Sequence, residues 1–453
     1  MVRHVITQHL AKGFTMFVYD FKFDDLTRIA YNAFLKNEHK YKNKPSFYVI
    51  NFDDLQRTHR CNPLEPSQMI DITDASESAR SILLALNKEW IKKSGEFFTE
   101  SAVIFVTAVI WWLRKYQDGK YCTLAHVIEL IQADYDDLFP VLGTEPECES
   151  LIQSFISAYL NRALEQLEGQ IASARIALAR LSSPTLYYVI SGNDFTLDIN
   201  NPEAPKIVCM GNNPSKTQTY GAVLSLYTNR LLKQVNQKGK LKSSLVFDEY
   251  PTIYQPLDYS VSVSRSNLVS HTICIQDYSQ MKKDYSREQA EVLMNVCGNI
   301  ISGQVLGDTA KMLSERIGKI VQERESVSIN RNDTSISRST QMDSAIPPSR
   351  ISSLSSGEFV GQVADDPLKI VKLKNFHSRI INDHEAIKTE ERSYKPLPII
   401  RHLSVNEVDN NYIRIKNDVV EIIESEIERI KSDPDLVHLL FVKSDQRNSR
   451  KAE

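Results

Sequence analysis

The sequence predicts an α/β protein built around a parallel β-sheet with helices on both faces. Short apolar runs of strand length alternate with segments of helical periodicity, and one long stretch between them is helical almost throughout. Over 453 residues, 42% are hydrophobic and 25% are charged. This composition is ordinary for a globular chain of two or three domains.

The first part of the chain alternates helix and strand. We expect a helix over residues 3–11, a strand over 14–20, a helix over 24–35 and a strand over 46–51. Because a helix separates the two strands, they should lie parallel in one sheet.

The next stretch, from about residue 75 to 181, shows helical periodicity. The expected helices are 78–93, 97–116, 124–137, 148–160 and 163–180. The longest apolar stretch, 102–113, is too short to span a bilayer of about 30 Å, so we expect a buried core helix and no transmembrane segment in this chain. The N-terminus also lacks the features of a signal peptide.

Strand signals then return, which suggests that an all-α domain is inserted into the sheet domain. We expect strands at 185–191, 206–211, 244–249, 271–276 and 299–302, with helices at 218–234 and 288–294. Residues 326–356 are rich in Ser, Arg and Asn and should form a long exposed loop or hairpin, followed by a strand at 358–363 and a charged helix at 410–431. The predicted domains are the first part of the sheet domain, the all-α domain, the rest of the sheet domain and a partly helical tail: 1–74, 75–182, 183–365 and 366–453.

Charge and cysteines say little about partners. The net charge of −3 gives no global basic field, so DNA contacts would have to come from a local patch or a pore lining. The six cysteines are scattered, with no Cys-x-x-Cys, which is typical of reduced thiols in a cytosolic protein. We therefore expect a cytoplasmic location.

The run 244–249 is an apolar strand that ends in Asp248 and Glu249, which is the form of a Walker B element. Asp248 would hold a metal ion directly or through water, and Glu249 would act as general base on the attacking water. An apolar run followed by Asp-Glu also occurs at ordinary strand ends. The partner motif of such a site, Gly-x-x-x-x-Gly-Lys-Ser/Thr, does not occur in the chain.

Six separated segments together resemble the TraG/TraD-type coupling proteins of conjugative type IV secretion, particularly those of Bacteroidetes mobile elements. The order of these segments matches the family's motor domain over roughly residues 10 to 365. They are Tyr19-Asp20-Phe21-Lys22, Asn62-Pro63-Leu64, Gly211-Asn212-Asn213-Pro214, Asp248-Glu249, the run 276–280, and Gly307 to Ala310 with Leu313, Ser314 and Gly318.

The resemblance implies a RecA-like fold of the P-loop NTPase type and a hexameric ATPase that uses ATP and Mg²⁺. Such a motor moves single-stranded DNA, attached to its relaxase, to a type IV secretion channel at the cytoplasmic face of the inner membrane. The inserted all-α domain would engage the transferred substrate. DNA contacts in the pore should come from loop Lys or Arg residues, for which Lys282 and Lys283 are candidates, although such a pair is commonly just solvated.

The resemblance also suggests roles for single residues. Gln276 is similar to the family's sensor glutamine, whose neutral amide can bond both water and a phosphate oxygen. Arg265 could reach across a subunit boundary onto the phosphate, although a solvated loop arginine is an equal alternative. Asp20 and Lys22 occupy the place of an Asp-x-Lys near the nucleotide, while Asp20 could instead cap the helix that begins near residue 24.

In the family, a Gly-rich loop comes just before the helix at which this chain opens. We therefore expect the C-terminal portion of a coupling protein, without the Walker A loop and the transmembrane region, that binds ATP weakly and is poorly soluble alone. One alternative is a non-catalytic adaptor that binds a relaxase or intact subunits. Another is a DNA-pumping ATPase of the FtsK/HerA group, which the segments at 62–64 and 211–214 and the inserted helices fit less well.

Overall fold

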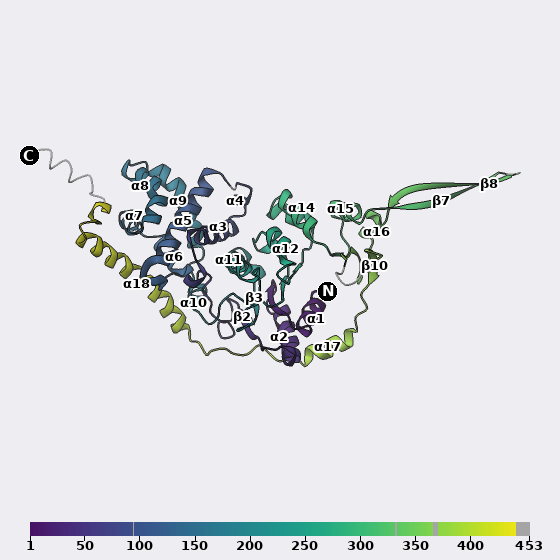
Figure 1. The fold of residues 1–453 in the computed structure, drawn as a ribbon, viewed down its shortest axis with the longest axis horizontal. Coiled ribbons are helices and arrows are strands. Elements are labelled where there is room, and N and C mark those ends of the chain that lie inside the picture. Colours follow the sequence, from purple (N-terminus) through teal and green to yellow (C-terminus); the bar gives the residue numbers. More distant parts are fainter. Residues whose placement is uncertain (94, 331–332, 366–369, 441–453) are drawn as a thin grey trace, which may run out of the picture. The chain divides into compact units, whose positions relative to one another are not determined.

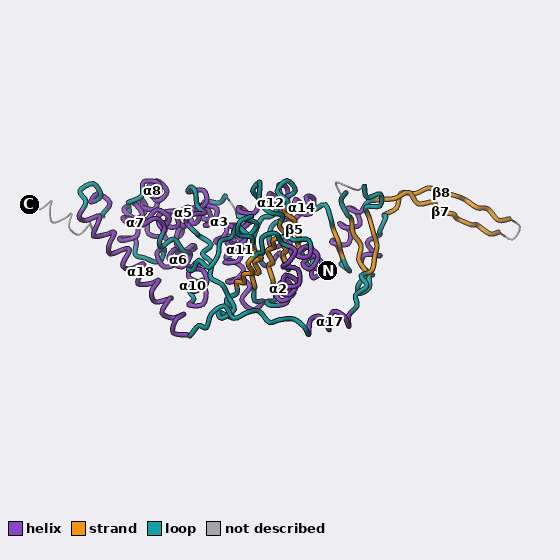
Figure 2. The backbone as a smooth tube through the Cα atoms, turned by 60° about the horizontal axis from the view of Figure 1, so that its bottom comes forward, coloured by secondary structure: helices purple, strands orange, loops and turns teal. Residues whose placement is uncertain are grey.

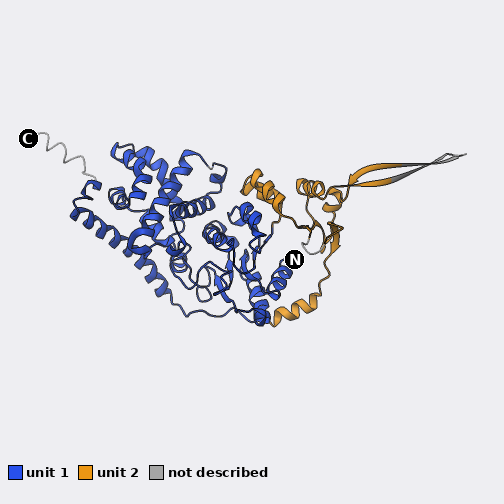
Figure 3. Ribbon diagram, in the orientation of Figure 1, with its two compact units in different colours: residues 1–274, 395–453 blue, residues 275–394 orange. Residues whose placement is uncertain are grey.

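A computed structural model describes residues 1–93, 95–330, 333–365 and 370–440. The chain divides into two compact units (Figure 3). Unit 1 comprises residues 1–274 together with the segment from residue 395 onward, and unit 2 comprises residues 275–394. The units are described separately.

Unit 1 contains a five-stranded parallel sheet (Figures 1 and 2). The strands are β1 (Thr15–Asp20), β2 (Ser46–Ile50), β3 (Lys206–Gly211), β4 (Ser243–Phe247) and β5 (Val269–Ile273), in the order β2-β3-β1-β4-β5. Every residue of β1, β3 and β4 is buried, as expected for parallel strands covered on both faces. The predicted parallel α/β sheet is therefore confirmed, with β1 at its centre.

Helices of the predicted kind cover the sheet. The helices α1 (Val2–Ala11) and α2 (Asp25–Asn37) pack on each other and share an apolar core with β1, β3 and β4. The helix α11 (Thr217–Val235) follows β3, and α12 (Asp258–Ser264) packs against β5.

The stretch between β2 and β3 is a helical module. Its helices are α3 (Ile72–Leu86), α4 (Glu89–Lys92), α5 (Phe97–Lys115), α6 (Leu124–Leu130), α7 (Tyr135–Gly143), α8 (Pro146–Leu160), α9 (Leu164–Ala179) and α10 (Pro184–Ile190). The helix α5 lies among α3, α6, α7, α8 and α9. In the described part of the chain, the stretch Phe97–Gly119 is long and apolar enough to cross a membrane, but 72% of its most apolar window is buried, which is the packing of a core helix.

One predicted strand is wrong. The strand expected at 185–191 is absent, because residues 185–190 belong to α10 instead. Pro184 stands in the first turn, where its missing N–H costs nothing, and residues 186–190 are all buried. A short run that is apolar on every side has no periodicity, so the sequence pattern does not separate a buried helix from a strand.

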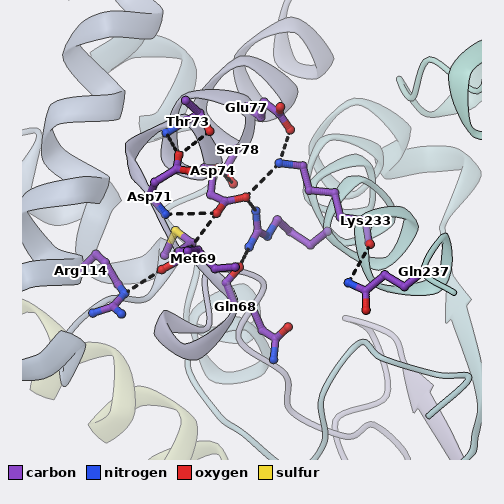
Figure 4. A network of polar contacts seen from close by, with 12 residues as sticks. Gln68, Met69, Asp71, Thr73, Asp74, Glu77, Ser78, Arg114, Lys233 and Gln237 are labelled. Atoms are coloured by element: carbon purple, nitrogen blue, oxygen red, sulfur yellow. Dashed lines mark hydrogen bonds and ion pairs between the residues drawn. The ribbon is translucent and has the colours of Figure 1, made fainter. Parts of the chain in front are cut away.

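A polar network joins the module to α11 (Figure 4). Asp74, in the first turn of α3, accepts hydrogen bonds from the backbone N–H of Ile70 at 2.8 Å and from Lys233 Nζ at 3.0 Å. Arg230 of α11, whose side chain is 3% exposed, lies 3.4 Å from the same carboxylate and donates to the carbonyl of Gln68 at 2.5 Å. Burial acts to raise the pKa of Asp74, but the hydrogen bonds from Lys233 and Ile70 and the charges of Lys233 and Arg230 hold it below its usual value. The module is thereby fixed to a helix of the sheet domain.

Unit 2 is built on a separate antiparallel sheet. The strands β6 (Ile300–Ser302), β9 (Glu358–Gln362) and β10 (Asn375–Arg379) pair in the order β10-β9-β6. The helices are α13 (Tyr278–Asp284), α14 (Arg287–Val296), α15 (Gly307–Ile317), α16 (Pro348–Ser352) and α17 (His384–Arg392). The expectation that the strand at 299–302 continues the parallel sheet is wrong, because that strand pairs with β9 instead.

A long hairpin of β7 (Lys319–Asn330) and β8 (Asp333–Ser344) extends from unit 2 (Figure 1). It confirms the hairpin alternative for the Ser-rich stretch, although it begins seven residues earlier than residue 326. The charged helix expected at 410–431 is α18 (Val405–Ser432) of unit 1, which packs on α6, α7 and α10 of the helical module.

Candidate functional site

The candidate site lies at the carboxyl edge of the parallel sheet, where ligands bind in folds of this kind. The strand β1 ends in Asp20, and β4 is followed by Asp248 and Glu249. Because β1 and β4 are parallel neighbours with Tyr19 opposite Phe247, the ends of the two strands lie side by side. The structure therefore brings together Asp20, Lys22, Asp248 and Glu249, as the sequence predicts.

Asp248 is held by the end of β1 on two sides. Its backbone N–H donates to the Tyr19 carbonyl at 3.1 Å, and its carboxylate accepts a hydrogen bond from the backbone N–H of Phe21. Burial raises the pKa of Asp248, while the Phe21 hydrogen bond and the charge of exposed Lys22 lower it. A cation close to this half-buried carboxylate would lower its pKa.

Glu249 makes a sharp turn directly after Asp248. Its backbone is left-handed, with φ of 49° and ψ of 55°. Such a conformation is uncommon for a residue other than glycine and occurs at functional sites more often than elsewhere. The next residue, Tyr250, donates its N–H to the carbonyl of Cys274 at 2.9 Å, which ties the turn to the end of β5. The Glu249 side chain is half-buried.

A chain of hydrogen bonds between side chains holds this turn in place. The Asn212 side-chain amide donates to the Tyr19 hydroxyl at 2.7 Å, and that hydroxyl lies 2.5 Å from Thr252 Oγ1. Thr252 Oγ1 uses its single proton on the carbonyl of Glu249 at 2.6 Å, so it must accept from Tyr19. Three side chains from three segments thus fix the backbone of Glu249.

Asn212 follows Gly211, the last residue of β3. Close packing explains why a glycine stands at position 211. A Cβ at Gly211 would collide with the ring of Phe23, which lies in the turn after β1. The absence of a side chain lets the segment after β1, which carries Lys22 and positions Asp248, lie against β3. Sequence reasoning used Tyr19, Gly211 and Asn212 only as marks of resemblance and missed these supporting roles.

Asp20 is fully buried. Its Oδ2 accepts from the backbone N–H and the hydroxyl of Thr27 at 2.8 and 2.7 Å, which confirms the capping alternative, since Thr27 lies in the first turn of α2. Its Oδ1 is buried with no hydrogen-bond partner among the described residues. Burial raises the pKa of Asp20 to about 6, and the charge of Asp248 adds to the increase.

Of the two remaining candidates, Arg265 lies apart from this group within unit 1, and Gln276 belongs to unit 2. Arg265 is exposed at the end of α12, and Leu268, three residues later, accepts from the N–H of Ser243, the first residue of β4. Arg265 is therefore at the amino edge of the sheet, opposite Asp248. Gln276 is exposed and belongs to unit 2, where the following Asp277 caps α13 through the N–H of Ser279 at 2.6 Å.

The residues at the edge fit a divalent cation better than they fit a nucleotide phosphate. Asp248 is a desolvated carboxylate, and Asp20 presents a buried oxygen that lacks a partner. Across the described ranges, no group of three or more His, Cys, Asp or Glu could hold a metal, so further ligands would have to be water or substrate oxygens. The chain has no Gly-x-x-x-x-Gly-Lys-Ser/Thr to cradle phosphates.

The comparisons with known proteins agree with this fold. Residues 4–395 match the family model for type IV secretory system conjugative DNA transfer. No curated protein matches by sequence. The structure resembles the bacterial conjugative coupling protein TrwB lacking its first 70 residues, in an unbound form, at 14% identity and a TM-score of 0.60, covering 84% of this chain and 81% of that one.

Two nucleotide complexes of the plasmid coupling protein TrwB are also similar. The complex with ADP and Mg²⁺ has 14% identity and a TM-score of 0.58, covering 88% of this chain and 82% of that one. The complex with the non-hydrolysable ATP analogue ADPNP has 14% identity and a TM-score of 0.59, covering 89% and 84%. These likenesses confirm the predicted RecA-like fold with an all-α domain. The family match over most of the chain shows that it belongs to the conjugative DNA transfer family of type IV secretion systems, as a coupling protein of the TraG/TraD type.

Proposed function

We propose that unit 1 supplies the catalytic carboxylates of an ATP-driven motor that couples a relaxase-bound single strand of DNA to a type IV secretion channel. The observation that carries the proposal is the pair Asp248 and Glu249 at the carboxyl edge. Asp248 is held by hydrogen bonds with backbone groups at the end of β1, and the carbonyl of Glu249 accepts a hydrogen bond from Thr252. The nucleotide complexes of TrwB support ATP and Mg²⁺ as the ligands of this edge.

In this proposal, Asp248 would hold Mg²⁺ directly or through a bound water, and the ion would supply positive charge against the nucleotide phosphates. The Glu249 carboxylate accepts the proton of the attacking water. Buried Asp20 orients the start of α2 through Thr27, and exposed Lys22 would contact the nucleotide.

Arg265 and Gln276 would serve the site from other directions. Because Arg265 lies at the opposite edge of its own sheet, it can act on a phosphate only in a neighbouring subunit, which fits a homo-hexameric ring. Gln276 would act as the sensor amide at the start of unit 2. Exposed Lys283 and partly exposed Lys282, in the last turn of α13, are candidates for sequence-blind contacts to DNA.

The phosphate-binding motif Gly-x-x-x-x-Gly-Lys-Ser/Thr does not occur in the sequence of this chain. We therefore propose that the chain alone binds ATP weakly and hydrolyses it very slowly, and that it works at the cytoplasmic face of the inner membrane through its partners. A phosphate-release assay on the purified protein tests this, with Glu249→Gln as the paired variant. Turnover near background in both proteins supports slow hydrolysis by the chain alone. Robust turnover that Glu249→Gln abolishes contradicts it.

The lack of this motif in the chain also favours a second candidate function, that of a non-catalytic adaptor that binds a relaxase or joins intact subunits. A pull-down with a relaxase in the absence of nucleotide distinguishes the two. Retention that is unchanged by Glu249→Gln, together with normal DNA transfer by that variant in cells, would favour the adaptor.

A further inference from the structure

The chain leaves unit 1 after Cys274 and returns to it at Lys395. From there, residues 395–440, which we call the belt, run as an extended segment and then as α18 along the helical module (Figures 1 and 3). The match to the family model ends at residue 395, so the belt lies outside the part of the chain that the family model describes.

The extended part of the belt is fixed to the sheet domain through backbone groups. The Asn32 side chain on α2 donates to the Lys395 carbonyl at 3.1 Å and accepts from the Lys395 N–H at 2.8 Å. The Gln56 carbonyl accepts from the N–H of Ile400 at 2.8 Å. Leu397 is buried, and its carbonyl accepts from Arg57 at 3.3 Å. This part of the belt is therefore tightly attached.

A cluster of Arg401, Asp194 and Arg60, which we call the joint, lies where the belt reaches the module. Arg401 forms an ion pair with Asp194, which follows α10. The same carboxylate accepts from the N–H of Arg60 at 2.8 Å, and the Arg60 guanidinium lies 4.4 Å from the centre of the Tyr188 ring of α10. The joint connects the belt, the segment after β2 and the end of the module.

The helix α18 lies on α6, α7 and α10, which together form what we call the helix seat. Ser404 and Glu407 begin the helix with a reciprocal capping box. The apolar side chains that α18 buries recur at helical spacing and are Val408, Ile415, Val419, Ile422 and Ile430. The opposite face is open, with Ile413 and Val420 each 53% exposed.

The helix seat is also rich in polar groups. His126 Nε2 lies 3.4 Å from Asp418 of α18, and the hydroxyl of Tyr412 lies 3.0 Å from Ser182 Oγ. Glu129 lies 3.6 Å from Lys416. Water could form hydrogen bonds with these polar groups if α18 were lifted. Such an interface, with an apolar centre and polar groups around it, resembles a reversible protein–protein interface more than a permanent core.

The module's own core does not depend on α18. The central helix α5 buries Phe105, Val109 and Leu113, and its principal neighbours are α3, α6, α7, α8 and α9. The principal contacts of α18 are with α6, α7 and α10 instead. Lifting α18 would thus leave the packing around α5 in place, while the joint at Arg401 and the contacts of residues 395–400 would keep the belt attached.

We propose that the belt is a removable strap: α18 occupies a helix seat on the module, and lifting α18 exposes that seat to an amphipathic helix of a protein partner with the same apolar spacing. The partner helix would carry an acidic group toward His126 and a basic group toward Glu129, as α18 does. The proposal does not depend on nucleotide binding at Asp248.

Native-state hydrogen exchange on the full chain gives the first test. A removable α18 should exchange its amides as one unit, at least about 10-fold faster than those of α5, without unfolding of the sheet. Equal rates in α18 and α5 would show that α18 is part of the core and would overturn the proposal.

A synthetic peptide of residues 404–432 gives the second test. It should bind the full chain carrying Ile415→Asp and Ile422→Asp, in which the strap is weakened, at least about 10-fold more tightly than the wild type or the matched control Ile413→Asp and Val420→Asp. A peptide that carries the first pair of changes itself should not bind. Equal binding to all three proteins, or loss of α5 protection in the weakened variant, would overturn the proposal.

Discussion

The side-chain amide of Asn212 donates a hydrogen bond to the hydroxyl of Tyr19 at 2.7 Å, beneath the carboxyl edge of the sheet. Burial of that hydroxyl raises the pKa of Tyr19, so it stays protonated and donates a hydrogen bond to Thr252. Through Thr252 the contact reaches the backbone of Glu249. The position of the candidate general base is thus fixed by a residue at the end of β3.

Tyr19→Phe should destabilise the protein and loosen the turn at Glu249. The change leaves the buried amide of Asn212 without its acceptor and Thr252 without its donor, which should cost about 1–3 kcal/mol. Urea denaturation measures the loss. Tyr259→Phe is the matched control, because Tyr259 is 74% exposed, and it should change the stability by less than about 0.5 kcal/mol.

Gly211→Ala should lower the free energy of unfolding by about 1–3 kcal/mol, since the added methyl collides with the ring of Phe23. Gly169→Ala is its control. Gly169 lies in α9, where a Cβ would meet only the Phe98 ring at 3.5 Å, and alanine there should stabilise the helix by about 0.5–1 kcal/mol. Thermal melts of both variants decide the matter: equal effects would mean that Phe23 does not pack on Gly211.

Asp20 should make stability depend on pH between about 4 and 6. Its pKa is raised from 3.8 to about 6 in the folded state, so the folded protein holds the proton more tightly, and stability is lost as pH rises through this window. The loss should be about 2–3 kcal/mol. Asp20→Asn should remove this part of the pH profile, as measured by urea midpoints at pH 4.5 and 7.5. An unchanged profile would place the titration elsewhere.

Asp74→Asn should loosen the helical module from α11 (Figure 4). It leaves the buried guanidinium of Arg230 without its counter-charge and weakens the first turn of α3, which should cost about 3 kcal/mol. Glu77→Gln is the control, since Glu77 is 52% exposed and its pair with Lys233 should contribute less than about 1 kcal/mol. Hydrogen exchange in α3 should increase in the first variant only.

Much of the fold could be predicted because its strands are short apolar runs separated by clear helical periods. The strands at 14–20, 46–51 and 206–211 lie within a residue of β1, β2 and β3. The pattern failed where every residue is buried, as in α10, and where pairing decides the sheet, as in β6. Neither the burial of a helix on all sides nor the partner of a strand is visible in local periodicity.

The candidate site could be predicted in part for a similar reason. Asp20, Asp248 and Glu249 stand at strand ends, and strand ends of a parallel sheet meet at one edge. The support from Tyr19, Asn212 and Thr252 depends on contacts between residues about 190 to 230 positions apart, which no local pattern contains. The left-handed turn at Glu249 is likewise visible only in the structure.

The most direct test of the central claim is a mating assay in donor cells that carry Glu249→Gln at the native locus. If Glu249 is the general base of the transfer motor, the frequency of DNA transfer should fall at least about 100-fold, while Glu421→Gln on the exposed face of α18 should transfer normally. Transfer by Glu249→Gln at the wild-type frequency, with normal protein levels, would contradict the claim that this edge of the sheet drives conjugative transfer.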